Sequence, residues 1–146
     1  MNVNMQSVMK AAAIGAIVNG ILAVLGQGLA YGLPTVAVIS SVFLCCGGFL
    51  IPVATGALYG FFTPGKETLQ QGAIGGAISG LVAGIAYGIL NSIMILILAL
   101  VNGLDVADAL AASTTTLVSG CCGAVIFGLM LGAIGGAIWT AVQKDK

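Results

Sequence analysis

The sequence has no histidine and almost no charge. Of 146 residues, 5% are charged, comprising four Lys and four acidic residues with a net charge of zero, whereas an ordinary soluble domain carries about 25% charged residues. This balance leaves no basic face and excludes a nucleic-acid-binding protein. A hydrophobic share of 60% excludes a disordered chain. With a mean hydropathy of +1.19, the composition also excludes a water-soluble globule and predicts a protein of the lipid bilayer.

Groups that usually carry catalysis are equally scarce. Besides lacking histidine, the chain has no carboxylate near the middle of an apolar stretch and no cofactor-binding motif. General acid/base catalysis and nucleophile activation therefore lack their usual side chains. We expect no enzymatic activity and no cofactor.

Four stretches approach the roughly 20 apolar residues that a membrane-spanning helix needs. They cover about residues 11–33, 35–62 and 72–100, and a fourth that follows a turn at residues 102–105 and ends near residue 142. Pro34 disfavours helix in the residue before it and therefore separates the first two. The sequence predicts an all-α, four-helix integral membrane protein with one domain, composed of a hairpin at 11–62, a loop at 63–71 and a hairpin at 72–142.

The lysines predict the orientation of the chain, because cytoplasmic flanks of membrane helices collect Lys and Arg. All four lie on one side of the predicted bundle: Lys10, Lys66, Lys144 and Lys146. The opposite side carries Asp105 and Asp108. We expect a multi-pass protein of the cell (plasma) membrane with both termini in the cytoplasm.

The two hairpins are related by an internal repeat. Ala13-Ile14-Gly15 recurs as Ala73-Ile74-Gly75 at a shift of 60 residues, and Cys45-Cys46-Gly47 recurs as Cys121-Cys122-Gly123 at a shift of 76. Two hairpin copies in one orientation form a parallel repeat. The larger shift places 16 additional residues at the outer tip of the second hairpin, which lengthens each of its helices by roughly 12 Å.

Glycine recurs at every fourth residue in the second hairpin. Small residues at this spacing let helix backbones approach closely in lipid, where no hydrophobic force drives helices together. The predicted helix-packing residues are Gly72, Gly76, Gly80, Gly84, Gly88, Gly120, Gly128, Gly132 and Gly136. In the first hairpin, Pro52 is predicted to kink its helix because it removes a backbone hydrogen bond.

Residues 13–20 (AIGAIVNG) and 73–80 (AIGGAISG) resemble the first helix of the proteolipid ring subunits of rotary ATPases, some of which fuse two hairpins. That resemblance implies a carboxylate near the middle of an outer helix, where the family picks up and releases its ion. This chain has none there, because Glu67 lies in the loop, Asp145 at the end, and the other two acids at the outer turn. The resemblance therefore extends to helix packing only.

The paired cysteines allow three interpretations. Cys45, Cys46, Cys121 and Cys122 are small residues that could fill a tight helix interface, thiols that could bridge two helices as a disulfide, or ligands for Cu(I) or another thiophilic metal. The vicinal pair within a span also resembles the Cys-Cys site of small mercuric-ion importers. That family often has a second, external pair, which this chain lacks.

Other polar and aromatic residues are expected to have structural roles. Asn19 and Gln27, eight residues apart, share one helix face and are predicted to form interhelical hydrogen bonds, as are polar residues of the second hairpin. These are Ser79, Asn91, Thr114, Thr115, Thr116 and Ser119. The aromatic residues near the predicted helix ends, Tyr31, Tyr59, Tyr87 and Trp139, are expected to anchor the protein at the membrane interface.

These observations favour a non-catalytic accessory or structural subunit of a larger membrane protein complex, packed through glycine-rich helix faces. Its expected partners are the lipid bilayer and other membrane subunits or further copies of itself. The alternative is a small membrane carrier or channel, with a thiophilic metal ion bound by the cysteine pairs as one candidate cargo.

Overall fold

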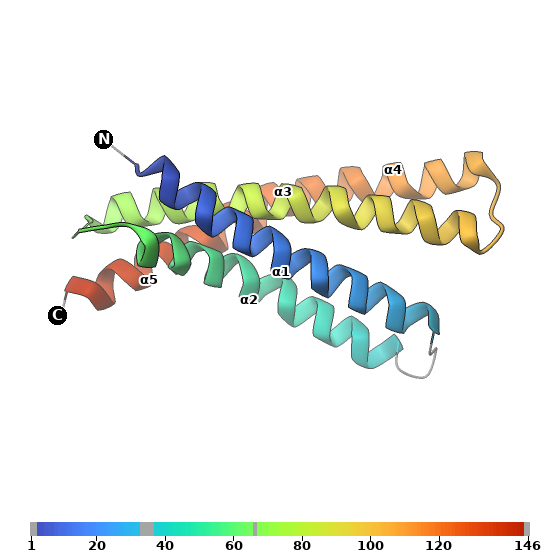
Figure 1. Ribbon diagram of the computed structural model, residues 1–146, viewed down its shortest axis with the longest axis horizontal. Helices are drawn as coiled ribbons and strands as arrows, with labels where there is room; N and C mark the ends of the chain where they lie inside the picture. The colour runs from blue at the N-terminus through green and yellow to red at the C-terminus, as the bar shows by residue number, and fades with distance from the viewer. Residues whose placement is uncertain (1–2, 33–36, 66, 145–146) are drawn as a thin grey trace.

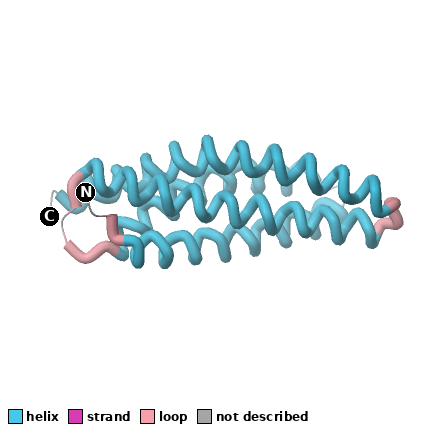
Figure 2. Tube along the Cα trace, turned by 90° about the horizontal axis from the view of Figure 1, so that it is seen from above, coloured by secondary structure: helices cyan, strands magenta, loops and turns pink. Residues whose placement is uncertain are grey.

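The protein is an elongated bundle of helices (Figures 1 and 2). The computed structural model describes residues 3–32, 37–65 and 67–144, and the side chains of these except 29–32, 37–48, 120, 121, 124 and 144. No strand occurs in these ranges, so the predicted all-α class is confirmed for the described part of the chain. The helices are α1 (Met5–Gly32), α2 (Ala37–Phe62), α3 (Leu69–Val101), α4 (Val106–Gly123), the π-helical turn η2 (Ala124–Gly128) and α5 (Leu129–Lys144).

The helices run back and forth along the long axis of the molecule. The start of α1 and the end of α5 lie at the same end of the bundle, and the turn between α3 and α4 lies at the other (Figure 1). This turn extends farther along the long axis than the ends of α1 and α2 that point the same way (Figure 1). The turn predicted at Pro34 lies outside the described residues, as do Lys66 and Lys146.

Helix α3 begins earlier than the apolar pattern indicates. The predicted span begins near Gly72, whereas the helix begins at Leu69 after the N-cap residue Thr68. The Thr68 hydroxyl accepts a hydrogen bond from the backbone N–H of Gln71 at 3.3 Å, and the Gln71 side chain accepts one from the backbone N–H of Thr68 at 3.1 Å. Such a capping box satisfies backbone donors that the first helical turn leaves unpaired.

Helix α1 also begins before its predicted span. It starts at Met5 rather than near Ala11, because the side chain of Asn4 accepts hydrogen bonds from the backbone N–H groups of Gln6 and Ser7, at 3.1 and 3.3 Å. The capped turn contains Gln6 and Ser7 and begins the helix before the apolar stretch predicted from the sequence. Hydropathy therefore located the span but not the first residue of the helix.

The fourth predicted span contains a π-helical turn that the sequence did not predict. Helices α4 and α5 are joined by η2 without a break in the chain of helical residues. A π turn adds about one residue to a helical turn, so the faces of α4 and α5 are rotated relative to those of a regular helix. The four-residue glycine spacing does not reveal such a turn, because Gly128 fits this spacing in the sequence whether the segment is α-helical or π-helical.

Pro52 lies within α2 and is buried. The helix continues beyond the proline to Phe62, and the hydroxyl of Thr55 donates a hydrogen bond to the Ile51 carbonyl at 2.8 Å. The kink at Pro52 stays a prediction.

Three described segments are long and apolar enough to cross a membrane: Met5–Gly28, Leu69–Val101 and Val125–Gln143. The described apolar part of α2 is shorter, at Phe49–Phe62. With 33 residues, α3 is about 50 Å long, against the roughly 30 Å of a bilayer's hydrocarbon core.

The bundle has small residues inside and large apolar side chains outside, the reverse of the distribution in a soluble protein. The largest fully buried side chains are those of Tyr59, Val8, Thr55 and Ser79, and buried glycines and alanines fill most of the remaining interior. Large aliphatic and aromatic side chains, such as Ile17, Leu50 and Met130, are more than half exposed. An interior of small residues with large apolar side chains outside is the pattern expected where lipid is the solvent.

The capping box at Thr68 leads to a stability prediction. We expect Thr68→Ala to lower the free energy of unfolding by about 1 kcal/mol, because the first turn of α3 loses its cap. Thr68→Ser, which keeps the hydroxyl, should behave like the parent chain. Unfolding of the detergent-solubilised protein by denaturant measures both, and equal stability of the Ala and Ser variants would contradict the assignment of the cap.

Candidate functional site: helix interfaces within the bundle

Helices α3 and α5 approach each other through glycine backbones. A Cβ atom added at Gly76 would lie 3.0 Å from the Cα of Gly136, and closer still to the Gly132 carbonyl oxygen. One added at Gly128 would lie 2.9 Å from the carbonyl oxygen of Gly80. Real Cβ atoms essentially never come within 3.0 Å of such atoms, so these positions have no room for a side chain.

The glycine-lined face of α3 extends beyond this contact toward both ends of the helix. A Cβ added at Gly72 would lie 2.8 Å from the hydroxyl oxygen of Thr140, which is buried and donates a hydrogen bond to the Gly136 carbonyl at 2.9 Å. Gly84 and Gly88 are buried farther along α3. The side-chain surroundings of Gly120 lie outside the described part of the chain.

Helix α5 contacts α2 in a similar way. A Cβ added at Gly56 would lie 3.0 Å from the Cα of Gly132, and one added at Gly135 would lie 2.8 Å from the carbonyl carbon of Val53. Gly132 therefore lies against both α2 and α3, which places α5 in the groove between these two helices. The sequence did not indicate Gly135 as a packing residue, because Gly135 falls outside the four-residue glycine series.

Tyr59 occupies the polar end of the bundle. Its side chain is 0% exposed and lies against Gly75, where a Cβ would fall 2.6 Å from a ring carbon. The hydroxyl donates a hydrogen bond to Glu67 Oε1 at 2.8 Å, which connects α2 with the loop that precedes α3. The prediction that Tyr59 anchors the protein at the membrane interface is wrong, because the ring packs inside the bundle.

Two polar atoms near this end are enclosed without a partner in the described part of the chain. They are the second carboxylate oxygen of Glu67 and the indole nitrogen of Trp139. The Trp139 ring lies against Gly60 and makes an edge contact with Phe61 at 5.7 Å between ring centroids. Unpaired enclosed polar atoms usually meet water, which the end of the bundle can supply.

A hydrogen bond between side chains joins α1 to α3. The amide nitrogen of Gln27 donates to the amide oxygen of Asn91 at 3.2 Å, so the predicted interhelical bond is confirmed for this pair. Ser7 also links two helices, because its hydroxyl donates to the Phe62 carbonyl at 3.1 Å. The sequence did not indicate which partner Gln27 would find, since only packing brings α1 against α3.

The other hydroxyls predicted to bond between helices bond instead within their own helix. Ser79 donates to the Gly76 carbonyl, and the hydroxyls of α4 donate to carbonyls three or four residues earlier at distances of 2.7 to 3.3 Å. These are Thr114, Thr115, Thr116 and Ser119. Local bonding of this kind satisfies the hydroxyl without a second helix.

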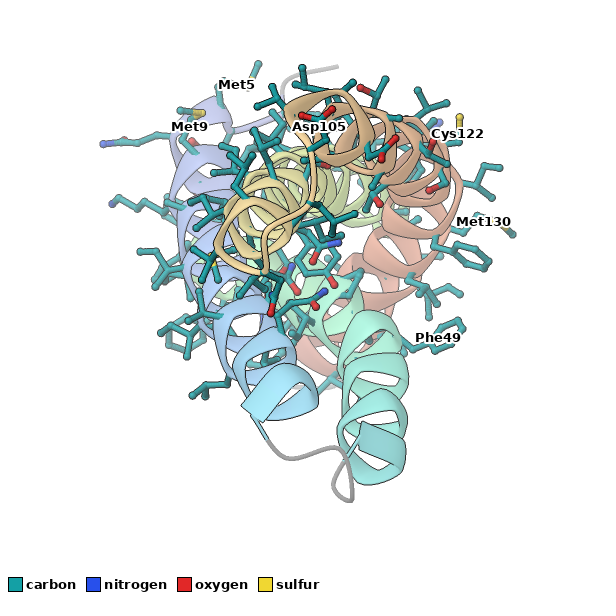
Figure 3. All side chains as sticks on the ribbon, turned by 90° about the vertical axis from the view of Figure 1, so that its right-hand side faces the viewer. Met5, Met9, Phe49, Asp105, Cys122 and Met130 are labelled. Carbon is teal, nitrogen blue, oxygen red and sulfur yellow. The ribbon has the colours of Figure 1, made fainter. Side chains whose placement is uncertain are left out.

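Of the four cysteines, only the Cys122 side chain is described. It is exposed and free, and its sulfur points away from the bundle (Figure 3). The interpretation that Cys122 fills a tight helix interface within this chain is therefore wrong. Side chains of Cys45, Cys46 and Cys121 lie outside the described residues. Among the side chains that are described, no three His, Cys, Asp or Glu residues come together as metal ligands.

Within the described residues, helix α4 has one neighbouring helix besides its own continuation. It packs against α3, and no contact with α1 or α2 occurs in that part of the chain. Ala109 and Ser113 are buried on the side of α3, while Ala107, Ala111 and Thr115 are exposed. This unpartnered small-residue face of α4, defined by Ala107, Ala111 and Thr115, has the four-residue spacing seen at the α3–α5 contact.

Comparison of the chain with protein-family models, with curated proteins and with solved structures finds no match.

The close contact of α3 with α5 leads to a prediction about stability. We expect Gly76→Ala to destabilise the bundle by about 1–3 kcal/mol, because the added methyl group forces two backbones apart. Gly28 is the matched control, since a Cβ there meets nothing within 4 Å; Gly28→Ala should be neutral, or stabilising by up to about 1 kcal/mol through helix propensity. Denaturant unfolding in detergent measures both, and equal effects of the two substitutions would contradict a tight contact at Gly76.

Proposed function

We propose that the protein crosses the plasma membrane four times, with both termini in the cytoplasm. Three described segments have the length and hydropathy of membrane spans, and α2 runs antiparallel to α1 beside them (Figure 1). An even number of passes agrees with the position of the start of α1 and the end of α5 at one end of the bundle (Figure 1). Lys10, exposed in the second turn of α1, supports a cytoplasmic location of that end.

Within this membrane, we propose a non-catalytic role as an accessory or structural subunit of a larger protein complex. The single observation that carries this proposal is the unpartnered small-residue face of α4. On α3, small residues at this spacing lie against another helix, as Gly72 and Gly76 do against α5. On α4 the corresponding face is exposed.

The hydroxyls of α4 make this face suitable for a helix partner. Because Thr114 and Thr115 donate to carbonyls of their own helix, a neighbouring helix needs to supply no polar group in return. Contact of helices through small residues is the main route to association in lipid. A partner helix from another subunit, or from a second copy, would complete the packing of α4.

The length of α3 and α4 supports a partner on the same side. Helix α3, with 33 residues, is longer than the hydrocarbon core of a bilayer is thick. Its part nearest the α3–α4 turn carries exposed apolar side chains, including Ile97, Leu100 and Val101. Val101 is 78% exposed. Apolar surface beyond the hydrocarbon core is favourably covered by protein, and a taller neighbouring subunit would cover it.

The proposal predicts that bulk added on α4 disrupts assembly without unfolding the chain. We expect Ala111→Phe to abolish co-purification of the partner in mild detergent, because the ring holds the incoming helix away. Ala54→Phe is the control, since Ala54 is likewise exposed but lies on α2, and it should leave co-purification unchanged. A wild-type protein that purifies from native membranes alone and as a monomer would overturn the subunit proposal.

A second test addresses the cysteines. In a structural subunit, the variant with all four cysteines replaced by Ala should insert in the membrane and retain its partners, because no step depends on a thiol. Quantitative co-purification measures the partners, and a metal-uptake assay in cells measures transport. Loss of metal uptake by a folded, inserted variant would favour the carrier over the subunit.

A further inference from the structure

Helices α4 and α5 form one continuous rod that is interrupted by five residues of π-helical backbone, Ala124–Gly128. Turns of this kind are rare and frequently mark a functional position in a helix. The segment contains no proline, so the irregular turn does not arise from a missing backbone donor. Its cause therefore has to be sought in the packing of the two helices that it joins.

On the α5 side of the π turn, two glycines face α3. A Cβ atom added at Gly128 would lie 2.9 Å from the carbonyl oxygen of Gly80, and one added at Gly132 would lie 3.2 Å from the Cα of the same residue. Both positions thus point at the backbone of α3.

On the α4 side, two small residues face the same helix. Helix α4 runs beside α3 (Figure 1), and Ala109 and Ser113 are its buried residues, at 0% and 8% exposed. Ser113 lines a small hollow between the two helices together with Ile89 and Ser92 of α3. The side of α4 that packs on α3 is therefore the side of Ala109 and Ser113.

The spacing of these two pairs does not fit a regular α-helix. Gly128 lies 19 residues after Ala109, and Gly132 lies 19 residues after Ser113. Eighteen residues complete about five turns of an α-helix, so a nineteenth residue turns the chain by about 100° more. The π turn accommodates about one additional residue, and it thereby brings both pairs onto one face.

Without the π turn, larger residues of α4 would face α3. The residues 18 positions before Gly128 and Gly132 are Leu110 and Thr114, and a regular helix would place these two against α3 while α5 kept its contacts. Leu110 is 49% exposed in the structure. Close helix contacts in lipid favour small residues, so the observed register, with Ala109 against α3, is the one that allows tight packing along the whole rod.

From this register we infer that η2 is a positioning segment, which absorbs one extra residue so that α4 and α5 present a common face to α3. The unpartnered small-residue face of α4 is then turned away from α3, because Ala111 lies about 200° around the helix from Ala109. This last consequence rests on the proposed function, in which a partner helix packs on that face. The register itself does not depend on a partner.

The test compares a one-residue deletion with a one-residue insertion at the same place. Deletion of Val125, which is 42% exposed, should convert η2 into regular α-helix and keep the wild-type midpoint of denaturant unfolding in detergent. An alanine inserted between Val125 and Ile126 should lower this midpoint, because the π turn already holds its extra residue.

Deletion of Ile134 is the matched control for the deletion of Val125. Ile134 is 49% exposed and lies between Gly132 and Gly136 in α5, which has no π turn to absorb the change. This deletion should lower the unfolding midpoint as the insertion does, since one of the two glycines turns away from α3.

Cross-linking measures the orientation of α4 independently of any partner. In a background with all four cysteines replaced by Ala, Ser92→Cys combined with Ser113→Cys should be joined by a short bifunctional thiol reagent. Ser92→Cys combined with Ala111→Cys, on the opposite side of α4, should not be joined. Deletion of Val125 should preserve both results, whereas the alanine insertion should abolish the first cross-link.

Equal losses of stability from the deletion of Val125 and the alanine insertion would overturn the inference, because a regular α-helix behaves in that way. Equal tolerance of both would also overturn it, because η2 would then hold no register. Loss of the partner from a deletion variant that keeps the cross-link would contradict the positioning of the partner-binding face. If the wild-type chain has no partner, the subunit proposal fails, while unfolding and cross-linking still decide the role of η2.

Discussion

The closest contact that two helices make in lipid is between their backbones, and only glycine leaves room for it. In this bundle that contact joins α5 to α3 and α2, where a methyl group on Gly76, Gly80 or Gly132 would overlap a neighbouring backbone carbonyl oxygen. In lipid, burying an aliphatic side chain between helices gains no hydrophobic free energy. Large apolar residues therefore lie outside, and the interior consists of small ones.

The polar groups of the chain follow from the same constraint. Hydroxyls on α4 bond to their own helix, so that they require no neighbour, whereas the Gln27 amide, which reaches farther from the backbone, bonds across to α3. Tyr59 reaches farthest of all, from the interior of the bundle to the carboxylate of Glu67 in a loop. Long polar side chains thus join separate parts of the bundle, and the hydroxyls of α4 are satisfied within their own helix, whereas the Ser7 hydroxyl bonds to the Phe62 carbonyl of α2.

Not every part of the bundle is closed by its own chain. Helices α1, α2, α3 and α5 pack together toward the end where α1 begins, whereas α3 and α4 extend farther toward the opposite tip (Figure 1). Toward that tip α4 has α3 as its single neighbouring helix within the described part of the chain. We infer that the unpartnered small-residue face of α4 receives protein, because it presents small residues at the spacing that lets helices pack closely in lipid.

The sequence by itself determined the all-α class, the apolar segments and the turn at residues 102–105, because these depend on local hydropathy and on glycine and charge in the chain. It located Gly76 and Gly132 in regular series but did not indicate which series would meet which, and it assigned Tyr59 to the membrane interface. Only the tertiary structure decided that Gly76 lies against Gly132, that Tyr59 packs on Gly75, and that Gln27 meets Asn91. Each of these is a contact between segments far apart in the sequence, and the rotation of one helix against another, including the π turn before α5, is set by packing rather than by any local pattern.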